Sequence, residues 1–554
     1  MNGLLPMLVL LPLIGGGVLL FFASRDSDVL PARRAALALA GITLILSLVL
    51  SGDALRRMSR MVIPSEDQIV APVISFQPPW LQVSLNGSQS LQLALGVDGL
   101  GIAMVLLTTI ITFAVLLFAS QSVTDRFSQY AGWTLLAESG LLLVFASMDV
   151  LSFYIGFELA LLPLLALIGG WGSGDSIAAA KRFVLYTLAG SIPMIVGIVG
   201  IVLKYSGDAG PTVLFADLSQ RAVAALPTET VGAQVCIFAL IVFGLGIKMA
   251  LLPLHTWLPT TYVSSHPTTA ALLAAVVLKL GLFGFLRIAL PLLPVATAEY
   301  GPSVLGVLGT AAIVYGALLA LSQTDLRLLL AYSSLSHVGF ITLGLFALNE
   351  EGIAGGALQM FNHGITTGAM FLLAGCIIAR RGTADLEKGA KGIASTYPRL
   401  ALLFVFFTIA GAGMPCLNNF VGELMTLTGM FARNPLLAAV GTLGVVFGAW
   451  YSLRVVRDIL FGELVEPKQQ HLTSKCDLTP SEWAPAACLA ALCIFIGVYP
   501  QYTLSILSRD TNRIAHVYGQ PAASSAADGQ VSENAAAASS SAVVDSPVVA
   551  QISR

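Results

Sequence analysis

Two lysines stand inside long apolar segments near the middle of the chain. Lys248 lies within residues 235–256 and Lys279 within residues 268–290, each among aliphatic side chains. A helix over 268–290 is long enough to cross a bilayer, and it would place Lys279 roughly 16 Å from either end. A lysine at that depth costs about 2.5–3.5 kcal/mol on insertion scales, and such residues commonly mark ion pathways. The alternative is that each lysine is a structural cation whose charge is satisfied by a neighbour.

The segment that contains Lys248 is interrupted by prolines. Pro253 follows Lys248 by five residues, and Pro259 comes soon after His255. Proline removes a backbone donor and breaks or kinks a helix. Membrane transporters build ion sites from such broken helices. We therefore predict a discontinuous helix at Lys248.

Five further ionisable side chains lie inside apolar segments or beside a helix break. They are Glu158, His255, His337, His363 and Glu423. Burial brings lysine and glutamate closer to proton exchange at neutral pH, and histidine titrates there without help. Together with the two lysines, these residues predict a polar row at mid-membrane depth that relays protons. Taken singly, each histidine is as well explained by a hydrogen-bonded core position, and Glu158 by a structural pairing with lysine.

The composition is that of an integral membrane protein. Of 554 residues, 56% are hydrophobic and 10% are charged, and the mean hydropathy is +0.85. Lipid requires each backbone polar group to be paired within its own element, so the apolar segments are expected to be α-helices. The six cysteines contain no CxxC pair, which argues against an iron–sulfur cluster, a zinc site or a disulfide framework. There is also no nucleotide-binding glycine motif, so we expect no cofactor and no metal in this chain.

Hydropathy predicts an all-α polytopic membrane protein with about fourteen transmembrane helices. The predicted spans are 4–22, 35–51, 98–119, 132–147, 149–169, 181–203, 235–256, 268–290, 303–322, 328–346, 354–379, 400–432, 436–461 and 483–507. The twelfth span is broken near Pro415, before Glu423, as the seventh is broken after Lys248. Two proline-interrupted helices in corresponding halves suggest a repeated five-helix unit.

These spans divide the chain into six parts. The expected divisions are N-terminal helices and a loop over 1–97, a third helix and linker over 98–131, a first repeat over 132–290, a second repeat over 303–461, a C-terminal helix over 483–507 and a tail over 518–554. The tail is rich in Ala, Ser and Val with few large side chains, a composition typical of disorder.

Several motifs occur together in an order that is specific to one family. They are GVDGLG with Asp98, FYIGFE ending at Glu158, YTLAGSIP at 186–193, KMALLPLHTWLP from Lys248, VLKLGLFGFLR around Lys279, YSSLSHVGF around His337 and FNHGITTGAMFLLAG around His363. Over about residues 90–465 the chain resembles the antiporter-like membrane subunits of respiratory complex I, most closely subunit 4 of NADH:ubiquinone oxidoreductase. The resemblance implies two inverted five-helix repeats, spans 4–8 and 9–13, with discontinuous helices 7 and 12.

The resemblance also implies a role for each buried ionisable residue. Glu158 would pair with Lys248 and modulate its proton affinity, while Lys279 and His337 would form the central connecting relay. His363 would extend that relay, and Glu423 would be its terminal group. A glutamate at this point of helix 12 is typical of subunit 4, whereas the other antiporter-like subunits and Mrp-type proteins carry lysine.

Two stretches depart from the family pattern. The run from Thr260 to Pro267 is one residue longer than usual and lacks the family's acidic residue, with His266 in place of the usual histidine. Cys416 follows the proline of helix 12 where glycine is usual.

The predicted function is proton translocation as a membrane-arm subunit of NADH:ubiquinone oxidoreductase, without a redox site in this chain. FMN, iron–sulfur clusters and quinone are expected in partner subunits. The expected partners are other complex I subunits, including neighbouring antiporter-like subunits and a lateral helix, together with membrane lipids but no nucleic acid. The expected location is the mitochondrial inner membrane, with a bacterial plasma membrane as the alternative. The alternative functions are an Mrp-type cation/proton antiporter subunit and a non-pumping structural membrane subunit.

Overall fold

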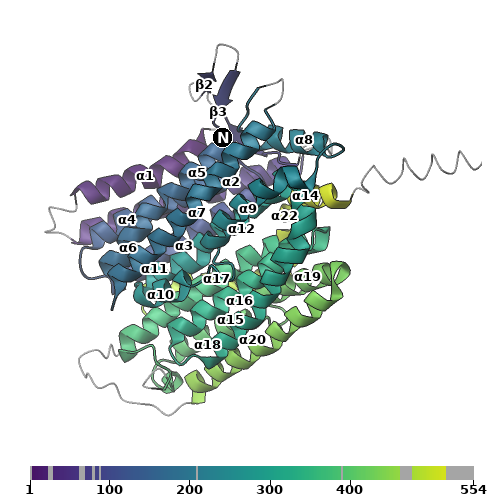
Figure 1. Cartoon of the computed structure of the whole chain (residues 1–554). Coiled ribbons are helices and arrows are strands. Elements are labelled where there is room, and N and C mark those ends of the chain that lie inside the picture. The colour runs from purple at the N-terminus through teal and green to yellow at the C-terminus, as the bar shows by residue number, and fades with distance from the viewer. Residues whose placement is uncertain are drawn as a thin grey trace, which may run out of the picture.

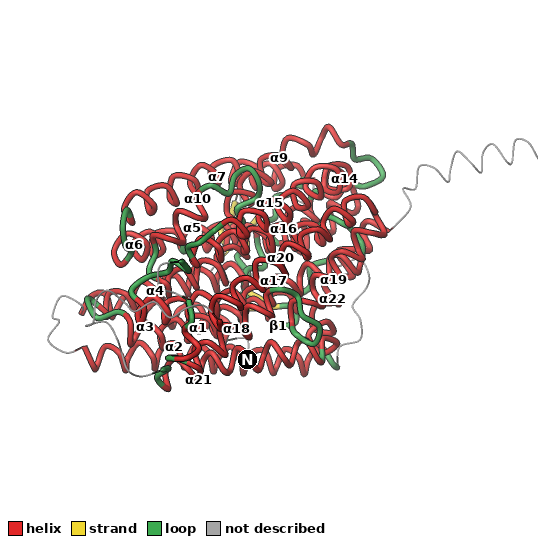
Figure 2. Tube along the Cα trace, turned by 90° about the horizontal axis from the view of Figure 1, so that it is seen from below, coloured by secondary structure: helices red, strands yellow, loops and turns green. Residues whose placement is uncertain are grey.

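Long apolar helices that run side by side at similar tilts make up most of the protein (Figures 1 and 2). The computed structural model describes residues 3–22, 29–60, 69–77, 82–85, 89–206, 210–387, 391–461 and 477–519. Within these residues, 12 helices are long and apolar enough to cross a membrane. The two remaining predicted spans correspond to the apolar helix Phe127–Phe145 and to a broken pair of helices, Pro398–Gly411 and Asn418–Arg433. The predicted all-α polytopic fold is therefore confirmed.

The N-terminal half begins with helices that pack around α3 and α4. Its helices are α1 (Leu4–Phe22), α2 (Val29–Met58), α3 (Gly99–Ser122), α4 (Phe127–Phe145), α5 (Val150–Leu159), α6 (Leu161–Trp171), α7 (Ser176–Lys204), α8 (Phe215–Ala225), α9 (Val231–Lys248) and α10 (Trp257–Ser264). Aspartates fix two of the helix starts, because a carboxylate satisfies backbone N–H groups that a first turn leaves unpaired. Asp98 accepts a hydrogen bond from the Gly101 N–H, and Asp149 accepts one from the Ser152 N–H.

The linker between α2 and α3 contains four short strands, which are all the strands found among the described residues. They are β1 (Ile74–Phe76), β2 (Gln82–Leu85), β3 (Gln89–Gln92) and β4 (Leu95–Val97). β1 pairs antiparallel with β4, with Ile74 opposite Val97, and β2 pairs antiparallel with β3. The β2–β3 ribbon projects beyond the ends of the helices (Figure 1). The hydropathy pattern predicted only a loop here.

The eighth span lies at the centre of the molecule. It runs continuously over Pro267–Leu292, and its most apolar window is 100% buried. It consists of α11 (Pro267–Leu272), the π-helical segment η3 (Leu273–Val277), α12 (Leu278–Gly284), a second π-helical segment η4 (Phe285–Ala289) and α13 (Leu290–Leu292). In Figure 1, α12 lies between the purple-to-blue helices of the N-terminal half and the green helices that follow.

The second half repeats the pattern of long helices with one break. Its elements are α14 (Pro294–Tyr300), η5 (Gly301–Leu305), α15 (Gly306–Ser322), α16 (Leu326–Leu345), α17 (Glu350–Arg381), η6 (Ile393–Ser395), α18 (Pro398–Gly411), α19 (Asn418–Arg433), α20 (Pro435–Phe461), α21 (Pro480–Val498) and α22 (Pro500–Gly519). α17 packs against α16, α18 and α19, so that the C-terminal helices surround it.

The last predicted span, 483–507, merges two separate helices. α21 ends at Val498, and α22 starts at Pro500, whose ring cannot continue the preceding helix. α22 is amphipathic, and its buried Asp510 accepts a hydrogen bond from the Leu100 N–H at the start of α3. Tyr518 of the predicted tail belongs to α22 and donates from its hydroxyl to the Leu290 carbonyl. The rest of that tail, 520–554, lies outside the described residues.

Candidate functional site

The helix break predicted at Lys248 is present. α9 ends at Lys248 and α10 begins at Trp257, and Ala250 between them has a φ of 60°. The carbonyls freed at the end of α9 find new donors. The Leu251 N–H donates to the Gly246 carbonyl at 2.8 Å, and the Trp257 indole donates to the Ile247 carbonyl at 2.9 Å. The carbonyl groups at the break are thus hydrogen-bonded. Lys248 is left at a helix terminus inside the membrane region.

A second break separates α18 from α19 in front of Glu423. Gly413 has a φ of 72° and Cys416 a φ of 69°, both in the left-handed region that favours glycine. A Cβ atom on Gly413 would lie 2.7 Å from Oε2 of Glu423. Glycine at 413 therefore meets two needs, the backbone turn and the space for the carboxylate.

Four of the predicted residues form one connected row in the protein core. Nζ of Lys279 on α12 lies 2.7 Å from Nδ1 of His363 on α17. The rings of His363 and His337 on α16 have centroids 5.2 Å apart. Nδ1 of His337 lies 3.1 Å from Oε1 of Glu423 on α19. The first and last contacts are within the reach of direct proton transfer, and the two histidine rings pack against each other between them.

The contact between His337 and Glu423 has ion-pair distance without hydrogen-bond alignment. Nδ1 of His337 is buried and has no aligned hydrogen-bond partner among the described residues, although Oε1 of Glu423 is 3.1 Å away. Oε1 also lies 3.4 Å from Nε2 of Gln359, which donates to it. The two side chains are therefore close enough to interact electrostatically but do not form an aligned hydrogen bond.

The irregular eighth span explains how Lys279 is held in an apolar core. The π-helical turns η3 and η4 flank α12, and Nζ of Lys279 donates to the Ala274 carbonyl in η3 at 2.8 Å. A π-helical turn alters the regular ladder and frees a carbonyl for a side chain, and such turns are frequent at functional sites. Lys279 is 0% exposed, so these two acceptors hold its ammonium group in place of water.

Lys248 and Glu158 lie outside the connected row, although α9, which ends at Lys248, packs against α12. The two side chains interact electrostatically, but in the described part of the chain no ion pair within 4 Å joins them. Instead, Nζ of Lys248 lies 4.5 Å from the centroid of the Phe157 ring and 5.8 Å from that of Phe183. Aromatic faces attract a cation and so hold the lysine without direct contact to the carboxylate. The predicted pairing of Glu158 with Lys248 therefore stays a prediction.

His255 does not join the row. It lies in the α9–α10 break, 7% exposed, with its ring edge-on to Tyr315 at a centroid distance of 5.5 Å. Its Nδ1 has no hydrogen-bond partner in the described structure. His266, which stands at the departure from the family pattern, places Nδ1 2.6 Å from the Thr268 hydroxyl, and that hydroxyl also contacts the Tyr130 hydroxyl at 2.6 Å.

The structure adds polar residues that the sequence reasoning did not single out. Glu138 on α4 is 0% exposed, and neither carboxylate oxygen has a hydrogen-bond partner among the described residues. The signal was a single acid in the middle of an apolar run, the same signal that drew attention to Glu158. The side-chain amides of Asn362 and Asn418 each donate to the other residue's carbonyl, which ties α17 to the start of α19. That pairing could not be read from one sequence, because it joins residues 56 positions apart.

Asp98 and Arg287 form a buried bidentate ion pair at one end of the molecule. Nη1 and Nη2 of Arg287 each donate to one carboxylate oxygen of Asp98 at 2.5 Å, and each side chain is 1% exposed. The pair joins the start of α3 to η4, in the same helix that carries Lys279. It is placed to fix that helix rather than to exchange protons.

Comparison with known proteins identifies relatives over most of the chain. A family model described as NADH:quinone oxidoreductase/Mrp antiporter, transmembrane, matches residues 147–448. NADH-quinone oxidoreductase subunit M of Rhodobacter capsulatus is 37% identical over 426 residues, covering 76% of this chain and 82% of the relative. NADH-ubiquinone oxidoreductase chain 4 of Marchantia polymorpha is 34% identical over 421 residues, with 76% and 82% covered.

Solved structures show the same similarity in three dimensions. A chain of respiratory complex I from Thermus thermophilus with bound NADH superposes with a TM-score of 0.79 at 32% identity, covering 93% of this chain and 100% of that one. A chain of the Mrp complex from Dietzia sp. superposes with a TM-score of 0.76 at 22% identity, covering 94% and 98%. At that identity the second match shows a common fold and no more.

Proposed function

Because this chain belongs to the NADH:quinone oxidoreductase/Mrp antiporter family, as a complex I antiporter-like membrane subunit, we propose that it translocates protons. In this proposal it is one membrane-arm subunit of a respiratory NADH:quinone oxidoreductase. The enzyme's redox chemistry occurs in partner subunits, and this chain moves protons in response to it.

The main support for the proposal is the connected row that runs from Lys279 through His363 and His337 to Glu423. All four residues are at most 5% exposed, and they come from four different elements, α12, α17, α16 and α19. Burying ionisable groups is expensive in an apolar core. A structural role would be served at lower cost by one closed ion pair, whereas a row of three bases and one acid provides successive acceptors for a proton.

The contacts at the two ends of the row are suited to stepwise proton transfer. Lys279 can pass a proton to Nδ1 of His363 across 2.7 Å. His337 lies next, and Glu423 beside the α18–α19 break is the terminal acceptor, 3.1 Å from His337. The resemblance to the family places Lys248 and Glu158 before the row, as a pair in which Glu158 modulates the proton affinity of Lys248. Closing or opening that pair would change the field on the rest of the row.

The repeats, the location of the cofactors, the partners and the membrane are inferred from family membership, as parts of the same proposal. Residues 132–290 and 303–461 form two inverted five-helix repeats, each with one broken helix. FMN, iron–sulfur clusters and quinone reside in partner subunits, and the described residues contain no cluster of metal-ligating side chains. The partners are neighbouring antiporter-like subunits and a lateral helix of another subunit. The protein is a multi-pass membrane protein, of the mitochondrial inner membrane or, as the alternative, of a bacterial plasma membrane.

An Mrp-type cation/proton antiporter subunit is the second candidate, because the family model that matches residues 147–448 covers Mrp antiporters as well. Glu423 favours the first candidate, since the resemblance associates glutamate at this position with subunit 4 and lysine with Mrp-type proteins. Sodium-linked transport without NADH oxidation would identify the second candidate. A structural subunit that does not pump is the third, and the retained lysines and glutamates argue against it.

The proposal is tested by Lys279→Met in the assembled complex. Methionine keeps a long apolar side chain but cannot bind a proton. We expect the complex to assemble in normal amounts, and NADH-driven proton uptake into vesicles to slow or uncouple. A Lys279→Met complex that pumps as the unmodified protein does would refute proton relay through this row, and loss of assembly alone would favour the structural role.

A further inference from the structure

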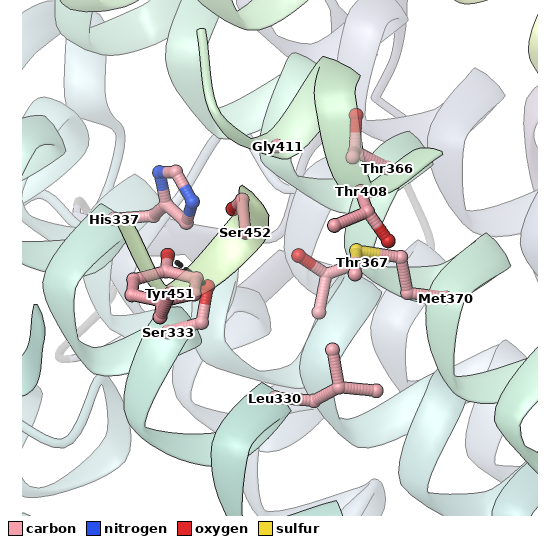
Figure 3. Close-up of a pocket in the computed structure, with 10 residues that line it drawn as sticks. All are labelled: Leu330, Ser333, His337, Thr366, Thr367, Met370, Thr408, Gly411, Tyr451 and Ser452. Atoms are coloured by element: carbon pink, nitrogen blue, oxygen red, sulfur yellow. Dashed lines mark hydrogen bonds between the residues drawn. The ribbon is translucent and has the colours of Figure 1, made fainter. Parts of the chain in front are cut away.

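A small cavity lies beside His337, between α16, α17, α18 and α20. The space open to the centre of a water molecule is about 10 Å³. A cavity of this size holds about one water. Six hydroxyl-bearing residues line it, namely Ser333, Thr366, Thr367, Thr408, Tyr451 and Ser452. Figure 3 shows His337, Ser333 and Tyr451 on one side of this cavity and Thr367, Thr408 and Met370 on the other. A polar cavity of this size inside an apolar helix bundle is a water site by its chemistry.

The ring of His337 supplies an independent reason for a water. The residue is 5% exposed and lines the cavity. Its Nδ1 stands 3.1 Å from Oε1 of Glu423 without hydrogen-bond alignment. A buried ring nitrogen is costly to leave without an aligned partner, so a water beside the ring would be stabilising. A water in the cavity would have the two to four polar partners that buried waters need.

The cavity extends from His337 toward one end of the bundle. Ser333 stands one turn before His337 on α16, on the side of Leu326, where that helix begins. The Ser333 hydroxyl lies 2.7 Å from the Tyr451 hydroxyl of α20. Ser333 is only partly buried, so this hydroxyl pair lies between the buried histidine and the outside of the protein.

We propose that this cavity binds one water that exchanges protons between His337 and the Ser333–Tyr451 hydroxyl pair, forming a side branch of the row. The proposal rests on the proposed function, because it deepens the proton pathway assigned there. The branch leads toward the end of the bundle that carries the start of α16 and the end of α20. His337 is then a junction that connects Lys279 and His363, Glu423 and the water branch.

Each transfer through the branch balances in protons and charge. A protonated His337 gives a proton to the water, which releases one of its own protons to a hydroxyl of the pair. That hydroxyl accepts one proton and releases another, so no covalent change remains. The reverse sequence delivers a proton to His337. No cofactor or oxidant is required.

The water is tested first, in a way that does not depend on pumping. Hydroxyl-radical footprinting of the intact complex, with radicals produced by X-ray radiolysis, oxidises side chains that touch bound water. We expect Met370, which lines the cavity, to be oxidised several-fold faster than Met430, which lies among apolar residues. Thr367→Val keeps the shape of the cavity wall but removes a hydroxyl, and it should slow the oxidation of Met370. Equal rates at the two methionines, or no effect of Thr367→Val, would overturn the water site.

The branch is tested next by three substitutions. Tyr451→Phe and Ser333→Ala each remove one hydroxyl of the pair, and both should slow NADH-driven proton uptake several-fold at unchanged complex abundance. Gly411→Val fills the cavity from α18. A Cβ atom at residue 411 would lie 3.8 Å from the side chains of Met370 and Thr366, which is an ordinary van der Waals distance. This variant should have the same effect, and Gly411→Ala, with a smaller side chain, serves if the valine prevents assembly.

Two matched controls separate the branch from general disturbance. Ser336→Ala removes a buried hydroxyl of the same helix that donates to the Ile313 carbonyl and does not line the cavity. Gly448→Val adds a side chain on α20 where no atom lies within 4 Å of the new carbon. Both should leave proton uptake unchanged. Normal uptake in Tyr451→Phe and Ser333→Ala would overturn the branch even if Met370 is oxidised rapidly.

Failure of this proposal differs from failure of the proposed function. If Lys279→Met pumps normally, the row itself is refuted, whatever the footprint at Met370. If Lys279→Met stops pumping while Met370 is oxidised no faster than Met430, the row stands and the water branch falls.

Discussion

Nζ of Lys279 contacts Nδ1 of His363 at 2.7 Å, although the two residues are 84 positions apart in the chain. This contact joins the fully buried eighth span to α17 and places a base directly beside the central lysine. Of the two histidines in the row, His363 is the one in direct contact with that lysine.

The contact predicts that His363 and His255 differ in importance. His363→Phe removes the only side-chain partner of the Lys279 ammonium group in the described structure, leaving it the Ala274 carbonyl. We expect most NADH-driven proton uptake to be lost while the complex assembles. His255→Phe is the matched control, because no described hydrogen bond or ion pair joins that ring to the row, and it should keep most of the uptake. A larger loss of proton uptake in His255→Phe than in His363→Phe would show that the pathway runs through the α9–α10 break instead.

Lys248 is predicted to require a proton that it can release. Lys248→Ala removes the charge, and Lys248→Arg keeps a charge that cannot be given up at physiological pH. Both should lose most proton uptake, the arginine variant while retaining the cation contact with Phe157. Uptake is measured in vesicles together with complex abundance. Normal pumping by Lys248→Arg would mean that protonation of residue 248 plays no part.

The Asp98–Arg287 pair is predicted to stabilise the eighth span without taking part in proton transfer. Asp98→Ala leaves a buried guanidinium without its bidentate partner, which costs about 3–5 kcal/mol, and complex abundance should fall. The double variant Asp98→Ala/Arg287→Leu removes both charges and should restore much of that abundance. Asp53→Ala breaks the partly exposed pair with Arg57, worth about 0–1 kcal/mol, and should change little. Abundance is read from native gels, and a double variant as scarce as Asp98→Ala would exclude this role.

Much of this architecture can be predicted from the sequence because lipid imposes simple rules. Apolar length predicts the spans, and proline predicts the breaks after Lys248 and before Glu423. The buried ionisable residues stand out because each is costly in an apolar run. The same rules miss Glu138, which carries the same signal, and they merge α21 with α22, because the apolar run continues past the turn at Tyr499.

The connections between the predicted residues are tertiary and cannot be read from periodicity. Nothing in the spacing indicates that Lys279 contacts His363, or that His337 lies beside Glu423. The π-helical turns around Lys279 depend on side-chain and backbone competition within the folded bundle. The aromatic faces beside Lys248 were present in the sequence as Phe157 and Phe183, but a cation–ring contact requires a known helix arrangement. The roles assigned to these residues stay predictions.

Protons are proposed to leave the row through Glu423, and the variant Glu423→Gln tests that exit. Glutamine keeps the size of the side chain and an oxygen that can accept from Gln359, but it cannot bind and release a proton. NADH-driven proton uptake is measured in reconstituted vesicles for the unmodified complex, Glu423→Gln and Glu423→Asp at equal complex abundance. We predict that Glu423→Gln assembles and loses most proton uptake while Glu423→Asp keeps part of it. Proton uptake by Glu423→Gln equal to that of the unmodified complex would contradict the account.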